Sequence, residues 1–257
     1  MQPYYSDSMT ALYLGDSREI LPALRLTADC VITDPPYGAE TSLAWDIWPD
    51  GWLEVAATIA PALWCFGSWR VFGPRWGEFT GAGWKFGQDV VWQKPRGSGF
   101  AADRFRRVHE TITHWYQGAW GDVHHDTPRI PRVGPPMRHG HHGRKKPGQS
   151  HTGEVGSRPW VEDGTRLQWS VIQAPQVRGG HPTQKPVEIL KPLIHYSVPP
   201  GGLVVDPFAG SGSTLVAARE MGRRAVGVEA SEEYCEVAAK RLSAIDAQPH
   251  LPFEVGA

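Results

Sequence analysis

The sequence has few cysteines and lacks any long apolar run. Its three cysteines, Cys30, Cys65 and Cys235, lie far apart, which argues against a disulfide framework and against a cysteine-based zinc site. No apolar run of about 18 residues occurs, so a membrane-spanning helix is excluded. Residues 1–10 lack the basic start and apolar stretch of a secretory signal. We therefore expect a soluble, cytoplasmic protein.

Net charge is also nearly absent, but the charged residues are unevenly distributed. The chain carries 26 Lys and Arg against 27 Asp and Glu, a net charge of −1. Residues 94–180 hold 14 basic and 7 acidic side chains, which leaves 12 and 20 for the remainder. A basic surface on an acidic scaffold attracts phosphates to one region. The distribution favours a nucleic-acid partner, and a solvated basic loop is the alternative.

Short apolar runs alternate with amphipathic stretches along much of the chain. Strands are predicted at residues 11–14, 30–33, 62–66, 88–92, 111–116, 203–205 and 225–228, and helices at residues 17–26, 53–59, 187–195, 214–221 and 231–245. Such alternation is typical of an α/β protein. The sequence contains no internal repeat.

One long segment interrupts this alternation. Residues 117–180 hold 11 Gly, 7 Pro, 6 His and 9 Lys or Arg, a composition that predicts little regular structure. A loop of this length within a compact domain is usually functional or disordered. His139, His141 and His142 have no Cys or acidic partner at a fixed spacing, so we expect no metal site there.

A glycine-rich turn follows the predicted strand at 203–205. Asp206-Pro207-Phe208-Ala209-Gly210-Ser211-Gly212-Ser213-Thr214 leads into a helix, where glycines let the backbone approach a ligand. Leu215 replaces the third glycine of the dinucleotide fingerprint, and the turn lacks the lysine of a phosphate loop. Glu229 ends the next strand, where a carboxylate can accept hydrogen bonds from ribose hydroxyls. A nucleoside with an amino-acid tail, such as S-adenosylmethionine, fits these features; ordinary strand-end carboxylates are the alternative.

A second motif ends the predicted strand at 30–33, at the position where open α/β sheets bind ligands. With this Asp34-Pro35-Pro36-Tyr37 turn, the sequence resembles the DNA amino-methyltransferases, which methylate the exocyclic amine of adenine or cytosine. The motif precedes the basic segment and the glycine-rich turn follows it, as in the permuted β class of that family. Residues 91–95, 109–112 and 181–186 are also similar to family elements.

The resemblance implies a circularly permuted Rossmann-like methyltransferase fold that begins at the third strand of the usual order and finishes with the first two. Residues 1–116 and 181–257 would form the catalytic and cofactor-binding domain, and residues 117–180 an inserted target-recognition region. The implied cofactor-binding residues are Asp16, Thr183, Lys185, Asp206, Phe208, Gly210, Ser211, Gly212, Thr214 and Glu229. The candidate DNA-binding residues are Arg129, Arg132, Arg138, Arg144, Lys145 and Lys146.

The implied reaction is methylation of a base flipped out of double-stranded DNA. The Asp34 side chain and the Pro35 carbonyl would accept the two amine protons, Pro36 would stiffen the turn, and Tyr37 would stack on the base. Adenine N6 is favoured because the motif begins with Asp, and cytosine N4 is the alternative. An RNA substrate, a non-catalytic DNA-binding protein and a nucleotide-binding oxidoreductase are further alternatives. A homodimer and a cognate restriction endonuclease are compatible with the resemblance.

Overall fold

The computed structural model describes residues 1–38, 46–98, 102–103, 105–132, 163–177 and 184–246. The chain divides into two compact units, which are described separately here. The larger unit consists of Met1–Asp126 and Trp169–Ala257, and the smaller one of Thr127–Gln168. No helix in the described part of the chain is long and apolar enough to cross a membrane.

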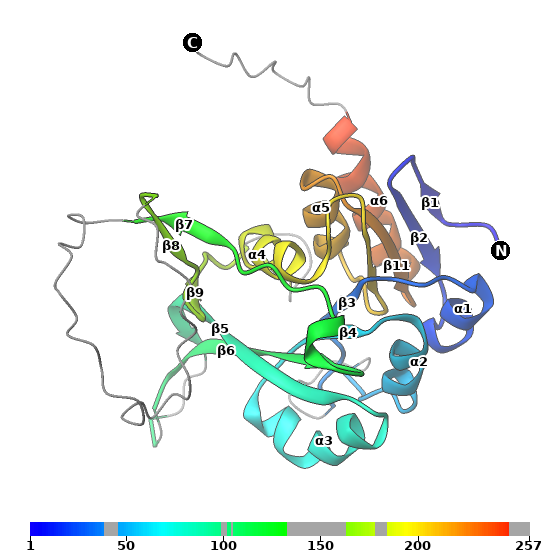
Figure 1. Cartoon of the computed structure of the whole chain (residues 1–257). Coiled ribbons are helices and arrows are strands. Elements are labelled where there is room, and N and C mark those ends of the chain that lie inside the picture. Colours follow the sequence, from blue (N-terminus) through cyan, green and yellow to red (C-terminus); the bar gives the residue numbers. More distant parts are fainter. Residues whose placement is uncertain (39–45, 99–101, 104, 133–162, 178–183, 247–257) are drawn as a thin grey trace, which may run out of the picture. The chain divides into compact units, whose positions relative to one another are not determined.

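A nine-stranded mixed sheet forms the centre of the larger unit (Figure 1). Its strands are β1 (Tyr5–Ser6), β2 (Thr10–Leu14), β3 (Cys30–Thr33), β4 (Ala62–Gly67), β5 (Lys85–Ser98), β6 (Arg107–Tyr116), β9 (Val171–Gln173), β10 (Leu203–Asp206) and β11 (Arg224–Glu229). They lie in the order β1-β2-β11-β10-β3-β4-β6-β5-β9. The pairs from β2 to β4 are parallel, and β6 runs antiparallel between β4 and β5.

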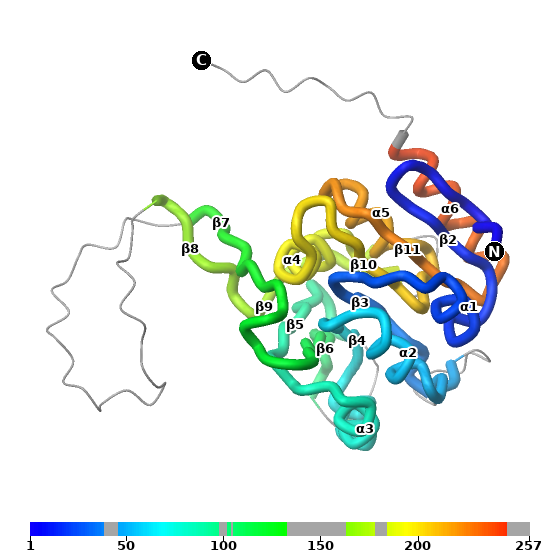
Figure 2. Tube along the Cα trace, turned by 45° about the vertical axis from the view of Figure 1, so that its right-hand side comes forward, coloured from blue at the N-terminus to red at the C-terminus, as the bar shows by residue number. Residues whose placement is uncertain are grey.

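This strand order confirms the permuted Rossmann-like fold. The first long strand, β2, pairs with the last strand, β11, with Leu12 opposite Gly227. Figure 2 shows these two segments side by side although one lies near each end of the chain. The β10 strand then pairs with β11 on one side and β3 on the other. The carboxyl ends of β10 and β3 therefore come next to each other, where parallel sheets bind ligands.

Helices cover both faces of the sheet. They are α1 (Ser17–Leu24), α2 (Trp52–Ile59), α3 (Trp69–Gly81), α4 (Val187–Ser197), α5 (Ser213–Glu220) and α6 (Glu232–Asp246), with a short 3-10 helix at Trp120–Asp122. Buried side chains of α4, α5 and α6 pack with Cys30 and Ile32 of β3, whereas those of α1, α2 and α3 pack with Val31. Successive residues of a strand face opposite sides, so β3 contributes to two separate cores.

Helix α3 and strand β9 are two of the elements that the sequence-based prediction missed. Helix α3 was not predicted, because it contains Pro74 and three glycines that lower helix propensity. It forms because Val71, Phe72 and Phe79 are fully buried against the sheet. Strand β9 comes from the segment expected to have little regular structure, yet it joins the sheet beside β5. The Trp92 indole N–H donates to the Ala174 carbonyl at 2.9 Å and helps to hold β9 there.

The smaller unit contains a two-stranded antiparallel sheet of β7 (Arg129–Pro131) and β8 (Thr165–Leu167). Arg129 of β7 donates from Nε to the Thr165 hydroxyl at 2.7 Å and pairs with Asp163 at 3.2 Å. Hydrogen bonds from Thr165 and the charge of Arg129 lower the pKa of Asp163 to about 2. Arg129 is therefore held by partners within its own unit.

Candidate active site

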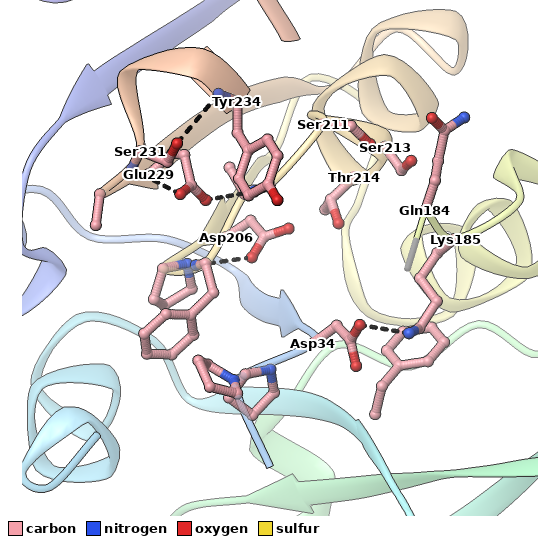
Figure 3. Close-up of a pocket in the computed structure, with 18 of the residues that line it drawn as sticks. Asp34, Gln184, Lys185, Asp206, Ser211, Ser213, Thr214, Glu229, Ser231 and Tyr234 are labelled. Atoms are coloured by element: carbon pink, nitrogen blue, oxygen red, sulfur yellow. Dashed lines mark hydrogen bonds and ion pairs between the residues drawn. The ribbon is translucent and has the colours of Figure 1, made fainter. Parts of the chain in front are cut away.

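A cavity of about 780 Å³ lies at the carboxyl ends of β3, β10 and β11. Figure 3 shows its polar side chains. Of the residues predicted for the site, its walls contain Asp16, Asp34, Pro35, Pro36, Tyr37, Lys185, Asp206, Phe208, Gly210, Ser211, Thr214 and Glu229. These side chains come from segments up to about 200 residues apart and meet because the permuted strand order places their strands side by side. The volume suits a small-molecule ligand.

The glycine-rich turn forms the wall between β10 and α5. Gly212 has φ of +75°, a conformation that favours glycine, and it is the N-cap of α5. A Cβ atom at Gly212 would lie 2.9 Å from the Ala238 Cβ, so the turn packs directly against α6. Arg241 of α6 donates from Nη1 to the hydroxyls of Ser211 and Ser213, at 3.0 and 3.1 Å. Helix α6 therefore fixes the end of the turn that leads into α5.

Asp206 ends β10 and lies almost fully buried at the base of the cavity. Its Oδ1 accepts hydrogen bonds from the Thr33 hydroxyl at 2.7 Å and from the Phe208 backbone N–H at 3.1 Å. Burial raises the pKa of Asp206 to about 6, although hydrogen bonds from Thr33, Thr214 and Phe208 oppose the shift. No cation pairs with Asp206 among the described residues, so its carboxylate can interact favourably with a positively charged group of a ligand.

Glu229 ends β11 and is held in place by the backbone on both sides. Its Oε2 accepts the Gly210 N–H at 2.7 Å, and its Oε1 accepts the Ser231 N–H at 2.9 Å. Burial raises the pKa of Glu229, and these backbone hydrogen bonds oppose that effect. Each carboxylate oxygen has a second lone pair, so the Glu229 carboxylate can also accept a hydrogen bond from a ligand.

The chemistry of these groups fits S-adenosylmethionine. Asp206 and Glu229 offer two carboxylates, and the turn at 206–214 contains no Lys or Arg. In the view of Figure 3, Asp206 lies between Glu229 and Asp34. Such a wall suits a ligand that carries an ammonium group and ribose hydroxyls better than one that carries phosphates.

The Asp34-to-Tyr37 turn forms the wall opposite Glu229. The Tyr37 hydroxyl donates to Asp34 Oδ1 at 2.6 Å, and the Tyr37 backbone N–H donates to Asp46 Oδ1 at 2.6 Å. Burial raises the pKa of Asp34 above its ordinary value, and the positive charge of Lys185 opposes this shift. Burial also raises the pKa of Tyr37 well above its usual range, so its hydroxyl stays protonated and remains a donor.

Lys185 lies at this same wall, where its Nζ atom donates to Asp34 Oδ2. Its Nζ also lies 3.3 Å from Glu110 Oε2, and Glu110 in turn pairs with Lys94 through Oε1. Sequence reasoning assigned Lys185 to the cofactor and gave Glu110 and Lys94 no role. The signal was available, because both residues lie in the segments at 91–95 and 109–112 that are similar to family elements.

Other predicted site residues are placed differently or not at all. Asp16 lines the cavity, but its carboxylate also caps α1 and binds Arg18 Nε at 2.9 Å. Thr183, Arg138, Arg144, Lys145 and Lys146 lie outside the described residues. Arg129 and Arg132 belong to the smaller unit. Ser231 and Tyr234 line the cavity and were not predicted.

Comparisons with known proteins agree with this fold and cavity. Residues 28–240 match the model of a family described as DNA methylase, the N6/N4 methyltransferases. The type II methyltransferase M.ScaI of Streptomyces caespitosus is 29% identical over 275 residues, which cover 95% of this chain and 84% of M.ScaI. The protein YubD of Escherichia coli K12 is 52% identical over 65 residues, which cover 25% of this chain and 29% of YubD.

Solved structures show the same fold. The M1.HpyAVI complex with S-adenosylmethionine superposes with a TM-score of 0.61 at 21% identity and covers 91% of this chain and 100% of its own. The cytosine-N4-specific PvuII DNA methyltransferase superposes with a TM-score of 0.61 at 17% identity and covers 93% and 88%. At 21% and 17% sequence identity, these structural similarities establish the fold of this chain.

The family match covers most of the chain, and the cavity has the two motifs expected of such a protein. The chain therefore belongs to the N6/N4 family of DNA methylases. It is an S-adenosylmethionine-dependent DNA methyltransferase that acts on an exocyclic amine.

Proposed function

We propose that this DNA methyltransferase methylates N6 of adenine in double-stranded DNA. The observation that carries the proposal is the carboxylate of Asp34 at the cavity wall, beside Pro35 and Tyr37. A carboxylate offers the target amine an acceptor with full negative charge, and Ser at the first position of this motif is commoner among the cytosine N4 enzymes that the sequence resembles. The runner-up, cytosine N4, uses the same geometry.

The cofactor supplies an electrophilic methyl group on a sulfonium sulfur. We assign its amino-acid end to Asp206 and to the turn at Phe208 and Gly210, which Gly212 shapes from behind the cavity wall, and we assign its ribose to Glu229. Asp16 follows β2, next to β11, and we assign it to the adenine end. Ser211 and Thr214 line the same wall.

The chain's part in the reaction is to prepare the target amine. The lone pair of an exocyclic amine is delocalised into the ring, so the nitrogen is a poor nucleophile. Hydrogen bonds from its two protons to the Asp34 carboxylate and the Pro35 carbonyl favour a tetrahedral nitrogen with an available lone pair. The two prolines fix the direction of the carbonyl at little entropic cost. Tyr37 would stack on the flipped base.

The proposal extends to partners. The basic segment at 117–180, including Arg129 and Arg132 of the smaller unit, would contact the DNA. We also propose a homodimer, and we propose a cognate restriction endonuclease because M.ScaI is named as a type II methyltransferase. Sedimentation of the purified protein tests the dimer. A host lysate that cleaves unmethylated DNA but not DNA methylated by this enzyme would reveal the endonuclease. The proposed location is the cytoplasm of a bacterial or phage-infected cell, on DNA.

The deciding experiment identifies the methylated base. Purified protein is incubated with labelled S-adenosylmethionine and unmethylated genomic DNA, and the DNA is digested to nucleosides for mass spectrometry. We expect label in N6-methyladenine, with a loss of at least about 10²-fold in Asp34→Ala, because the acceptor for the amine is removed. Asp89→Ala is a matched control, since Asp89 is exposed on β5 and does not line the cavity. Label in N4-methylcytosine would overturn the choice of base.

A further inference from the structure

Four charged side chains form a continuous row at one wall of the catalytic cavity. Asp34 follows β3, Lys185 precedes α4, Glu110 lies on β6 and Lys94 lies on β5. Lys185 hydrogen-bonds to Asp34 and lies 3.3 Å from Glu110, and Lys94 hydrogen-bonds to Glu110. The signs alternate along the row, so each carboxylate faces at least one cation. Figure 3 shows the Asp34 end of this row.

The row is largely removed from water. The side chains of Lys185 and Lys94 are 9% and 10% exposed, and those of Glu110 and Asp34 are 16% and 21% exposed. Burying four charges carries a desolvation cost that their pairing often fails to recover, so a buried ion pair is weak evidence for a stabilising role. A row of this kind at the reacting end of a cavity suggests that its charges serve the reaction.

The row fixes the direction of the carboxylate that faces the target amine. Tyr37 donates to Oδ1 of Asp34, and Lys185 donates to Oδ2. With both oxygens held, the carboxylate cannot rotate freely, and its remaining lone pairs keep a constant direction. The Lys185 ammonium is itself fixed by Glu110 on one side and lies 5.4 Å from the centre of the Phe66 ring.

We propose that Lys185 is a positioning residue for methyl transfer, which keeps the Asp34 carboxylate ionised and correctly directed, and that Glu110 and Lys94 hold Lys185 in place. This inference rests on the DNA methyltransferase activity and is independent of whether adenine or cytosine is the target. It differs from the cofactor-binding role that the sequence suggested for Lys185, because the contacts of its ammonium group are with Asp34 and Glu110.

The charges around Asp34 predict the direction in which the removal of each charge would shift the pKa of Asp34. Lys185 lowers the pKa of Asp34, whereas burial and the negative charge of Glu110 raise it. In the described part of the chain, the other titratable groups that face Asp34 are Tyr37, which donates a hydrogen bond, Cys65 of β4, and Asp206 of β10. The two carboxylates raise the pKa of Lys185 in spite of its burial, so Lys185 stays a cation through neutral pH. A protonated Asp34 would lose acceptor capacity, so the rate of methyl transfer should fall as the pH drops through the pKa of Asp34. This fall is the acid limb of the pH–rate profile.

The test is the pH dependence of single-turnover methyl transfer to DNA, measured with the full-length protein. Lys185→Met removes the charge and keeps the length of the side chain, so we expect the acid limb to move to higher pH and the neutral-pH rate to fall about 10²-fold. Glu110→Gln removes the opposing charge, so we expect the acid limb to move to lower pH. Lys191→Met is the matched control, because Lys191 lies on α4 in an exposed pair with Glu220 and does not line the cavity.

Opposite movements of the acid limb in the two variants, with unchanged affinity for S-adenosylmethionine in calorimetry, support the proposal. An unmoved limb, or movement in the same direction in both variants, overturns it and leaves the row a structural feature. Loss of cofactor affinity in Lys185→Met with an unmoved limb returns Lys185 to the cofactor. If Lys185→Met does not fold, Glu110→Gln decides: a limb that fails to move to lower pH overturns the proposal. Absence of labelled DNA with the wild-type protein is a failure of the assigned activity instead.

Discussion

Substituting Asp206 by Asn should make the protein more stable at neutral pH. Asp206 is 4% exposed, and burial raises its pKa to about 6 from an ordinary value of 3.8. Asn keeps an oxygen at the Oδ1 position, which accepts from Thr33 and Phe208. The Thr214 hydroxyl can turn to accept from the new amide group. The substitution therefore removes a buried charge while it retains most of the hydrogen bonds.

The sign and magnitude follow from proton linkage. A carboxyl whose pKa is higher in the folded protein favours folding below its unfolded pKa, and this contribution is lost as the pH rises through the folded value. For Asp206 the window runs from about pH 4 to about pH 6. At about 1.4 kcal/mol per pH unit, the shift corresponds to about 2 to 3 kcal/mol. Between pH 4 and pH 7.5, the stability of Asp206→Asn should therefore rise relative to wild type by that amount.

Urea denaturation of both proteins at several pH values measures this difference. The absolute free energies of unfolding change with every titrating group, but the difference between the two proteins isolates Asp206. If the free energies of unfolding of the two proteins differ by a constant amount between pH 4 and pH 7.5, burial does not destabilise the ionised form of Asp206. In that case the reasoning about its environment would be wrong.

The remaining predictions concern the cofactor wall. Glu229→Gln should lower the affinity for S-adenosylmethionine about 10-fold or more in calorimetry, because hydrogen bonds to a charged acceptor are stronger. Glu232 is exposed and does not line the cavity, so the control variant Glu232→Gln should bind S-adenosylmethionine with wild-type affinity. Equal affinities in both variants would contradict the assignment of Glu229 to the ribose. Gly212→Ala should lower the free energy of unfolding by about 1–3 kcal/mol more than Gly222→Ala does. Both glycines have positive φ, but of the two only Gly212 has a neighbour, Ala238, within 4 Å of its Cβ position. Equal losses in urea denaturation would show that α6 accommodates the methyl group.

Much of the fold followed from local patterns. The strand predicted at 30–33 is β3 with the same bounds, and the strands at 62–66 and 203–205 are each one residue short of β4 and β10. These strands are apolar and bounded by Pro or Gly, so their signal needs no tertiary context. Helix α3 and strand β9 escaped prediction because burial and sheet pairing, which are tertiary effects, outweigh their local sequence preferences.

The sequence by itself determined the two motifs of the site and their order along the chain. The Asp-Pro-Pro-Tyr turn and the glycine-rich turn are each contiguous, so proline and glycine impose their backbone geometry locally. Tertiary structure alone decided which charges meet across the cavity. Lys185 lies 151 residues from Asp34, and its partner Glu110 lies on a different strand. No local pattern encodes an ion pair over that separation, because it exists through the packing of α4 and the sheet order that brings β3 and β6 to either side of β4.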